Sequence, residues 1–469
     1  MVFTSQIFLF YFLPLVLGIY YSLPKSSAWR NSFLLGASYI FYGWWNPWFI
    51  LLMLFATAVN YSGGWIISRA PYGSPRRKWA LAASVTASLG TLGFFKYFMF
   101  LESNVNTVLS WLDGPTLAVI QVTLPIGISF YIFQSMTYTI DIYRGDAPPA
   151  RSFTDFACFV SLFPQLVAGP IVRYNTIASQ LVQRDYTLDR FSSGSALFIL
   201  GCAKKILLAN IVGGIADSAF EAEAPGVIDA WFGVTAYAFQ IYFDFSAYSD
   251  MAIGLGRMLG FEFLRNFNSP YRSASITEFW RRWHISLSTF LRDYLYIPLG
   301  GNRRGERRMY LNLAIVMLLG GLWHGANWTF VAWGGYHGAL LAFERWRGKR
   351  GIANFLPRPV QVASTFVLVL FSWVLFRSPG LGDAGRYFGA MFGLNGGGAI
   401  GPLLAAELYS PGHLILMGLC ALLAFQPVQA YDLAHEITWA KTVALASLFA
   451  AAVAAMFTQA FNPFLYFQF

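Results

Sequence analysis

The residue best placed to do chemistry is His324, in the run from Gly320 to Phe330 that reads Gly-Gly-Leu-Trp-His-Gly-Ala-Asn-Trp-Thr-Phe. Apolar stretches flank it on both sides. Lipid cannot solvate a charged imidazole, so we expect the ring to face the interior of a helix bundle or a wet cavity. A neutral imidazole there can take a proton from a hydroxyl near pH 7. The alternative is a neutral histidine that forms a hydrogen bond across helices, and position alone favours neither interpretation.

A second candidate is His284, in the run Phe-Trp-Arg-Arg-Trp-His-Ile-Ser-Leu-Ser over residues 279–288. At 100° per residue, the apolar side chains between positions 280 and 295 form one stripe of a helix, with charged residues opposite. This pattern predicts an amphipathic helix that lies in the membrane interface, with His284 on the side that faces the protein. The basic loop at 301–308 then marks the cytoplasmic surface.

A polar and aromatic helix is predicted over residues 240–250, Gln-Ile-Tyr-Phe-Asp-Phe-Ser-Ala-Tyr-Ser-Asp. Asp244 and Tyr248 share one face at i and i+4, and no basic residue lies on that face, so both are candidates for contact with a substrate. Lys204 and Lys205 interrupt a separate apolar span. We expect them to snorkel to an interface, and the alternative is contact with an anionic group such as a coenzyme phosphate.

The remaining histidines and cysteines show no pattern of their own. On an unbroken helix His337 would lie about 140° away from His324, so the two are not expected to form one site. Cys158, Cys202 and Cys420 have neither the spacing of metal ligands nor that of a disulfide framework. Motifs for a nucleophile or a phosphate-binding glycine loop are also missing from the sequence. We therefore predict no metal site.

Composition places these residues in a membrane protein. The chain has 469 residues, of which 57% are hydrophobic and 12% charged, and its mean hydropathy is +0.51. Soluble domains carry about twice that charged fraction. The net charge of +10 is best explained by the basic loops that orient a membrane protein. Nucleic-acid binding would need a basic soluble domain, and none is evident.

Apolar runs predict eleven to twelve membrane spans, each needing ~20 residues. The N-terminus has no basic region and no cleavage site, so its apolar run is expected to stay as a span. The runs lie at 7–23, 32–46, 48–67, 79–99, 117–140, 192–213, 229–256, 309–324, 326–343, 359–376, 411–428 and 440–460. The segment 153–182 is apolar but interrupted by prolines and a glycine, and it is predicted to be re-entrant or interfacial.

Basic residues in the loops give the orientation. The loops after the second and fourth spans hold no basic residue. The basic residues follow the first, third and fifth spans: Lys25, Arg30, Arg69, Arg76, Arg77, Lys78, Arg144 and Arg151. Because basic loops stay in the cytoplasm, the N-terminus is expected on the opposite, periplasmic side.

Two motifs carry a family resemblance. Residues 323–328 and 279–288 resemble the two histidine motifs of the membrane-bound O-acyltransferases. The opening residues 1–5, the run at 242–250 and the closing run at 462–469 are similar to the bacterial branch that acetylates alginate and related exopolysaccharides. The resemblance covers essentially the whole chain, and it is weakest at about 378–410.

The resemblance implies an all-α bundle with re-entrant and interfacial helices around a central tunnel. It implies a single acyltransferase domain over residues 1–469. Within it, residues 1–152 would form N-terminal spans, 153–345 a catalytic core with both histidine motifs, and 346–469 C-terminal spans.

It also implies transfer of an acetyl group from cytoplasmic acetyl-CoA towards O-acetylation of a polysaccharide in the periplasm, across the bacterial inner membrane. Acetyl-CoA would be a substrate, with no tightly bound cofactor, and the partners would be periplasmic O-acetyltransferases. His324 matches the invariant histidine and would act as general base, typically worth ~10²–10⁴-fold in rate. His284 matches the second histidine. Trp323, Asn327 and a backbone N–H are candidates to stabilise the oxyanion.

Alternatives remain at this stage. D-alanyl transfer to a cell-wall polymer shares both motifs, and a non-enzymatic transporter for a polysaccharide or lipid carrier would explain the spans but not the two inward histidines. The immediate acceptor is a sugar or a hydroxyl of a partner protein. A basic surface that includes Arg281, Arg282, Arg303 and Arg304 is expected to gather the anionic donor, although these charges also fit plain positive-inside topology.

Overall fold

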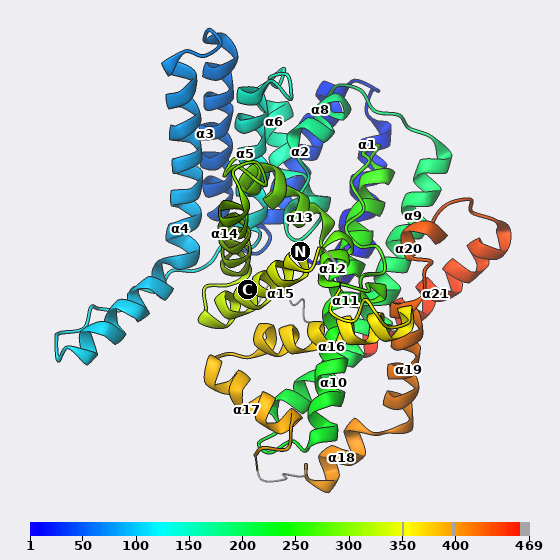
Figure 1. Cartoon of the computed structure of the whole chain (residues 1–469). Helices are drawn as coiled ribbons and strands as arrows, with labels where there is room; N and C mark the ends of the chain where they lie inside the picture. Colours follow the sequence, from blue (N-terminus) through cyan, green and yellow to red (C-terminus); the bar gives the residue numbers. More distant parts are fainter. Residues whose placement is uncertain (349–350, 396–399, 460–469) are drawn as a thin grey trace. The chain divides into compact units, whose positions relative to one another are not determined.

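The computed structural model describes residues 1–348, 351–395 and 400–459, and within these ranges every regular element is a helix (Figure 1). The predicted all-α class is confirmed. The closing run at 462–469, which supports part of the family resemblance, lies outside the described residues. Two compact units are distinguished, Met1–Phe198 with Met251–Leu264, and Ile199–Asp250 with Arg265–Phe469. The prediction of one domain with three parts stays a prediction.

The first unit contains the N-terminal helices. They are η1 (Phe8–Phe12), α1 (Leu13–Ser22), α2 (Ser27–Gly43), α3 (Phe49–Arg69), α4 (Pro75–Trp111), α5 (Ile128–Arg144), α6 (Phe153–Ser161), α7 (Phe163–Leu166), α8 (Tyr174–Val182) and most of α9 (Leu188–Ala203). The segment predicted to be re-entrant is divided into α6, α7 and α8, and its residues from 155 to 172 are buried. Pro164 lies in the first turn of α7, where a missing backbone N–H costs nothing.

The second unit holds both histidine motifs. Its elements are η2 (Lys204–Ala209), α10 (Asn210–Glu221), α11 (Val227–Met258, to Asp250), η3 (Pro270–Arg272), α12 (Ile276–Arg282), α13 (Ile285–Leu291), η4 (Arg292–Tyr296), α14 (Glu306–His324), α15 (Trp328–Trp346), α16 (Arg358–Arg377), α17 (Leu381–Met391), α18 (Pro402–Leu408), α19 (Pro411–Phe425), α20 (Ala430–Leu433) and α21 (Trp439–Thr458). Its buried core is built mainly by α10, α11, α16 and the segment from η3 to α12.

Each predicted apolar run contains a helix, but fewer helices meet the length and composition of a membrane span. Four of the described helical segments do so: Phe49–Arg69, Leu188–Glu221, Arg358–Arg377 and Trp439–Thr458. The bent pair α18 and α19 makes a fifth if it counts as one span. Among the others, α2 and α5 have 17 residues each, which is short of the ~20 that a span needs.

The predicted continuous amphipathic helix after Ser275 is wrong. The chain forms α12, breaks at Trp283 and His284, and resumes as α13. His284 adopts the left-handed conformation with φ of 43°, which no residue inside an α-helix can have. The break turns the imidazole back onto the new helix, where it serves as the N-cap.

Helices α14 and α15 pack with their backbones in contact because glycines face each other. A Cβ atom on Gly321 would lie 2.2 Å from the carbonyl oxygen of Phe330, and one on Gly334 would lie 2.3 Å from that of Met317. Small residues at such crossings are typical of helix packing in membranes. This contact fixes the corner at which His324 ends α14.

We therefore expect Gly321→Ala to lower stability by ~1–3 kcal/mol, the usual cost of overpacking, and to reduce activity. Thermal unfolding of the detergent-purified chain measures the effect. Gly335→Ala is the matched control, because its new Cβ would lie 3.7 Å from the nearest atom, a side-chain methyl of Leu318. Equal unfolding temperatures for the two variants would contradict the close-packing argument.

Candidate functional site

His324 lies at the corner between two helices. It is the last residue of α14, and Gly325 leaves the helix in an extended conformation. Asn327 then caps α15, since its side-chain oxygen accepts the N–H of Thr329 at 3.1 Å, while its amide nitrogen donates to the carbonyl of Pro379 at 2.8 Å. The fold thus uses both ends of the Asn327 amide, and its predicted part in oxyanion stabilisation gains no support from these contacts.

Aromatic rings enclose the imidazole of His324, which is 5% exposed. The ring centroids of Trp323 and Trp333 lie 5.0 Å from it, and that of Phe376 lies 5.2 Å away. These walls keep bulk water from the ring, and they position it from three directions.

Trp323 brings the two histidine motifs together. Its ring lies 5.0 Å from that of His324 and 6.0 Å from that of His284. His284 is fully buried, and the ring of Phe245 packs edge-on against it at 4.6 Å. The structure therefore places these two predicted residues around one tryptophan, at a single site in the second unit.

His284 is held in a defined state. Its Nδ1 accepts the backbone N–H of Leu287 at 3.3 Å, so the proton of the neutral ring is on Nε2. Nε2 is buried and has no hydrogen-bond partner among the described residues. Burial lowers the pKa of His284 to about 3, because desolvation disfavours the charged ring. At neutral pH this residue is a hydrogen-bond donor rather than a base.

A third buried histidine, His337, lies beside the same cluster. Trp333 packs against both His324 and His337, with the second pair of centroids 4.9 Å apart, and the indole N–H of Trp280 donates to Nδ1 of His337 at 3.3 Å. The prediction of about 140° between the two histidines assumed an unbroken helix, and that assumption is wrong, because α14 ends at His324 and α15 begins at Trp328. Gly325 and Asn327, common helix stop and start residues, were the signal for the break.

Two ion pairs join η2 to α11, and the first of them is buried. Lys205 Nζ lies 2.7 Å from Asp244, and these side chains are 4% and 2% exposed. Lys204 contacts the carboxylate of Asp250 and donates to the hydroxyl of Ser246 at 3.1 Å. Lys205 is buried in its ion pair, so the expectation that it snorkels is wrong. Lys204 is 18% exposed, and for it the expectation stays a prediction. Asp244 has a basic partner after all, and it comes from another helix.

Three predicted site residues remain, one on α11 and two on α12. Tyr248 is buried in α11. Arg281 is exposed, and Arg282 binds Glu278 at 2.8 Å and the carbonyl of Asn268 at 3.0 Å. Their role in binding a substrate stays a prediction. Among the residues that the structure describes, no group of three or more His, Cys, Asp or Glu side chains could hold a metal ion.

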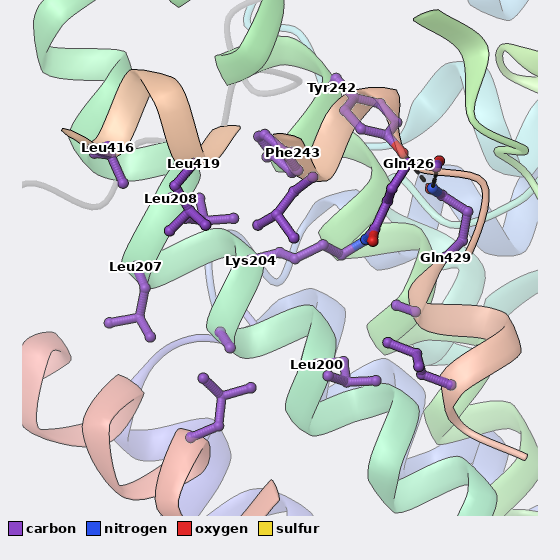
Figure 2. Close-up of a pocket in the computed structure, with 15 residues that line it drawn as sticks. Leu200, Lys204, Leu207, Leu208, Tyr242, Phe243, Leu416, Leu419, Gln426 and Gln429 are labelled. Carbon is purple, nitrogen blue, oxygen red and sulfur yellow. Dashed lines mark hydrogen bonds between the residues drawn. The ribbon is translucent and has the colours of Figure 1, made fainter. Parts of the chain in front are cut away.

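A cavity of about 340 Å³ opens beside Lys204 (Figure 2). Leucines of η2 and α19 line one side, and Gln426 and Gln429 lie on the other, where Tyr242 donates a hydrogen bond to Gln429. The ring of Tyr242 also lies 6.5 Å from that of Trp283, next to His284 in the chain. Tyr242 thus connects the cavity to the segment that carries His284, but neither His284 nor His324 lines the cavity.

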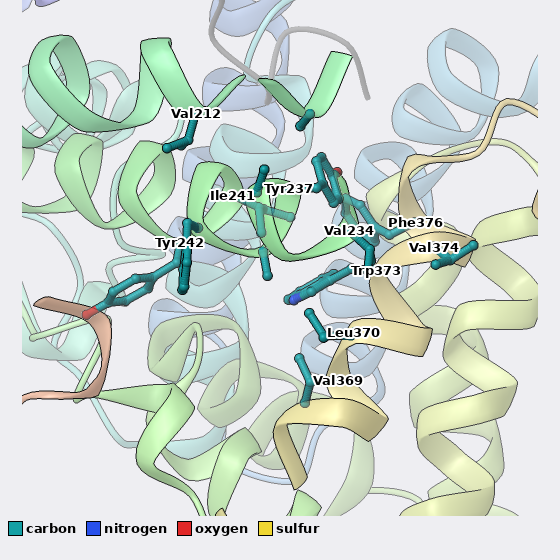
Figure 3. Packing of buried hydrophobic residues seen from close by; sticks show 14 of the residues in the cluster. Val212, Val234, Tyr237, Ile241, Tyr242, Val369, Leu370, Trp373, Val374 and Phe376 are labelled. Atoms are coloured by element: carbon teal, nitrogen blue, oxygen red, sulfur yellow. The ribbon is translucent and has the colours of Figure 1, made fainter. Parts of the chain in front are cut away.

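The hydrophobic core of the second unit, drawn in Figure 3, contacts the site through α16. Side chains of α11, such as Val234 and Tyr237, face α16, which carries Trp373 and Phe376. Trp373 packs on Trp283 with centroids 5.0 Å apart, and Phe376 packs on His324. The same core therefore positions both histidine segments.

Comparison with known proteins assigns the family. Residues 149–375 match the model of the MBOAT, membrane-bound O-acyltransferase family. The chain is 44% identical to the probable alginate O-acetylase of Azotobacter vinelandii over the full length of both. It is 35% identical to the peptidoglycan O-acetyltransferase of Helicobacter pylori, over 84% of this chain and 80% of that protein. It is 30% identical to the teichoic acid D-alanyltransferase of Streptococcus thermophilus, over 45% and 54%. The chain, a multi-pass membrane O-acyltransferase, belongs to the membrane-bound O-acyltransferase family.

Proposed function

We propose that this O-acyltransferase passes an acetyl group from cytoplasmic acetyl-CoA across the membrane, towards periplasmic O-acetylation of an exopolysaccharide such as alginate. One observation carries the proposal: His284, Trp323 and His324 form one buried site. The chain's full-length similarity to a probable alginate O-acetylase supports the acetyl donor and the polysaccharide end product. We place the chain in the bacterial inner membrane with its N-terminus in the periplasm, as its basic loops favour.

In this proposal His324 acts as general base. The hydroxyl oxygen of the acceptor attacks the thioester carbonyl carbon while the imidazole takes the hydroxyl proton. When the C–S bond breaks, the departing sulfur takes that proton, which leaves free coenzyme A and an acetyl ester. The aromatic walls around His324 limit hydrolysis by excluding water.

His284 has the geometry of a donor to the thioester oxygen. Its Nε2–H is available in a buried setting, and the cap on Leu287 holds the ring still. A preorganised donor of this kind stabilises the negative charge that develops on the oxygen in the transition state. The two histidines therefore divide the work, one as base and one as hydrogen-bond donor.

A substitution separates this role from the structural one. Asparagine tolerates the left-handed conformation and can accept the Leu287 N–H, so His284→Asn should fold but lack the Nε2–H. We expect kcat to fall ~10²–10³-fold, the usual cost of losing one such donor, with little change in unfolding temperature. Steady-state kinetics with acetyl-CoA test this, and His284→Ala should lose stability as well. An asparagine variant with normal kcat would make His284 purely structural.

A second cavity is a candidate binding site for the phosphates of acetyl-CoA. A cavity of about 480 Å³ at the loop before α14 is lined by Arg303 and Arg304, both exposed. Arg292, at the same cavity, is already bound to Asp293. We expect Arg303→Gln/Arg304→Gln to raise KM for acetyl-CoA, with an effect that shrinks as salt screens the charges over a Debye length of ~10 Å at 0.1 M. If KM changes neither when the charges are removed nor when the salt concentration is raised, these arginines serve only to set the orientation of the chain in the membrane.

The proposal is tested with purified full-length protein in lipid vesicles, its periplasmic partner and a polysaccharide acceptor. Acetyl-CoA labelled in the acetyl group should yield labelled ester together with an equal amount of free coenzyme A thiol. A D-alanyl thioester of a carrier protein tests the alternative, which the partial similarity to a D-alanyltransferase favours less. Transport of polymer without thiol release would point to a transporter and overturn the proposal. The immediate acceptor in this scheme is a hydroxyl of the partner or of the sugar.

A further inference from the structure

A groove along the first half of α16 plays no part in the proposed reaction. It forms a cavity of about 540 Å³ whose lining includes two arginines, Arg272 and Arg358, and the apolar side chains of Val362, Phe366, Val367 and Phe425. These residues all belong to the second unit. The groove thus combines two arginines with an apolar channel.

The two arginines have positive charge to spare. Arg272 ends η3 and forms no ion pair with any carboxylate of the described ranges. Arg358 is 65% exposed and lies 3.6 Å from Glu278, a longer contact than the 2.8 Å between Arg282 and the same carboxylate. Glu278 also accepts the backbone N–H of Ala274 at 2.9 Å. Arg282 and the Ala274 N–H therefore already bind the Glu278 carboxylate, and the two arginines at the groove can bind another anion.

The apolar channel follows a helix that is long and apolar enough to cross a membrane. Arg358, Val362 and Phe366 share one face of α16 at i, i+4 and i+8, which spans ~12 Å at 1.5 Å per residue. Helix α16 is one of the four described helical segments that can cross a membrane. Phe425 of α19 forms the facing wall, with its ring centroid 5.1 Å from that of Phe366. A hydrocarbon chain fits this channel, whereas amides of a pantetheine arm would lose hydrogen bonds to water there without replacement.

We propose that the groove binds one anionic phospholipid of the membrane, with its phosphate at Arg272 and Arg358 and an acyl chain beside Val362 and Phe366. Basic pockets at the ends of membrane helices select anionic head groups in this way. Arg358 begins α16, at the end that the positive-inside rule assigns to the cytoplasm, and Arg272 lines the same groove. Phe366 also contacts Tyr271, with centroids 5.0 Å apart, so the bound chain would pack next to the core of the second unit.

Native mass spectrometry of the purified full-length protein tests the proposal. After delipidation, phosphatidylglycerol and phosphatidylcholine with identical chains are added back, and we expect one phosphatidylglycerol to be retained per protein. Arg272→Gln/Arg358→Gln should weaken this binding about 30-fold, from ~1 kcal/mol for each arginine. Arg272→Lys/Arg358→Lys should retain most of it. Val362→Trp, which fills the channel, should also weaken it while leaving the arginines in place.

The matched control removes two other exposed charges from a loop predicted to be cytoplasmic. Arg76→Gln/Lys78→Gln should bind phosphatidylglycerol as the natural protein does. Equal retention of both lipids, or unchanged binding in the Arg272/Arg358 variant, would overturn the proposal. Displacement of the lipid by acetyl-CoA, with a raised donor KM in that variant, would assign the site to the donor's phosphates instead. Because lipid retention needs no turnover, a failure of the proposed acetyl transfer would leave this result intact.

Discussion

Replacing His324 with alanine or glutamine is expected to abolish acetyl transfer. The proposed mechanism has no other base within the aromatic enclosure formed by Trp323, Trp333 and Phe376. General-base catalysis contributes ~10²–10⁴-fold, so the remaining rate should be at most about 1 per cent of normal. The measurement is thiol release from acetyl-CoA by the purified protein in lipid vesicles with acceptor present.

Protein level and membrane insertion should stay normal in these variants, because glutamine occupies a similar volume in the pocket. His435→Ala is the matched control, since that histidine is exposed and removed from the site in sequence. Full activity in a correctly inserted His324→Ala protein would refute the role of general base. Loss of the protein from the membrane would instead indicate a structural role for the ring.

Lys205→Met is expected to cause the largest loss of stability. It leaves the Asp244 carboxylate buried without the ammonium that lies 2.7 Å away, and removing one partner of a buried ion pair costs ~3–5 kcal/mol. Activity should fall with stability, because α11 also carries Phe245, which packs on His284. Thermal unfolding in detergent gives the stability change.

A double variant distinguishes loss of the charge partner from loss of packing. Lys205→Met/Asp244→Leu removes both charges, and apolar replacement of a whole buried pair is often neutral or stabilising. The double variant should therefore be more stable than Lys205→Met alone. If the two variants unfold at the same temperature, the loss of the Lys205 charge beside the Asp244 carboxylate is not the cause of the lower stability.

The sequence predicted the helices well where apolar runs were long. Every predicted apolar run contains a helix, because burial of apolar side chains dominates their local structure. The run at 117–140 is an informative partial case, since α5 begins only at Ile128 and the preceding residues form no helix. Those residues are apolar enough for a membrane span, but hydropathy does not report their backbone conformation.

The two histidine motifs were found from sequence, whereas the conformation of His284 was not. Its left-handed backbone depends on contacts with Asn266, whose carbonyl accepts the N–H of Ile285 and whose side chain accepts that of Ser286. These bonds join positions that are about twenty residues apart. Helical periodicity treats each segment by itself and therefore predicted one continuous helix.

The same limit explains the lysines and His337. Periodicity shows which residues share the face of one helix, so it compared Asp244 with α11 alone and missed Lys205 on η2. His337 became relevant only because the corner at Gly325 folds α15 back along α14, which lets Trp333 contact two histidines. Contacts between helices depend on the tertiary fold, which one sequence does not specify by pattern.

The most direct test of the central claim is the sidedness of transfer in sealed vesicles that hold the protein in one orientation. Acetyl-CoA is supplied only on the face of the 301–308 loop, and the partner with its polysaccharide only on the other. We predict labelled ester on the acceptor face and free coenzyme A thiol on the donor face, with both lost in His324→Ala. Transfer only when donor and acceptor share one face would contradict the account, even with His324 essential.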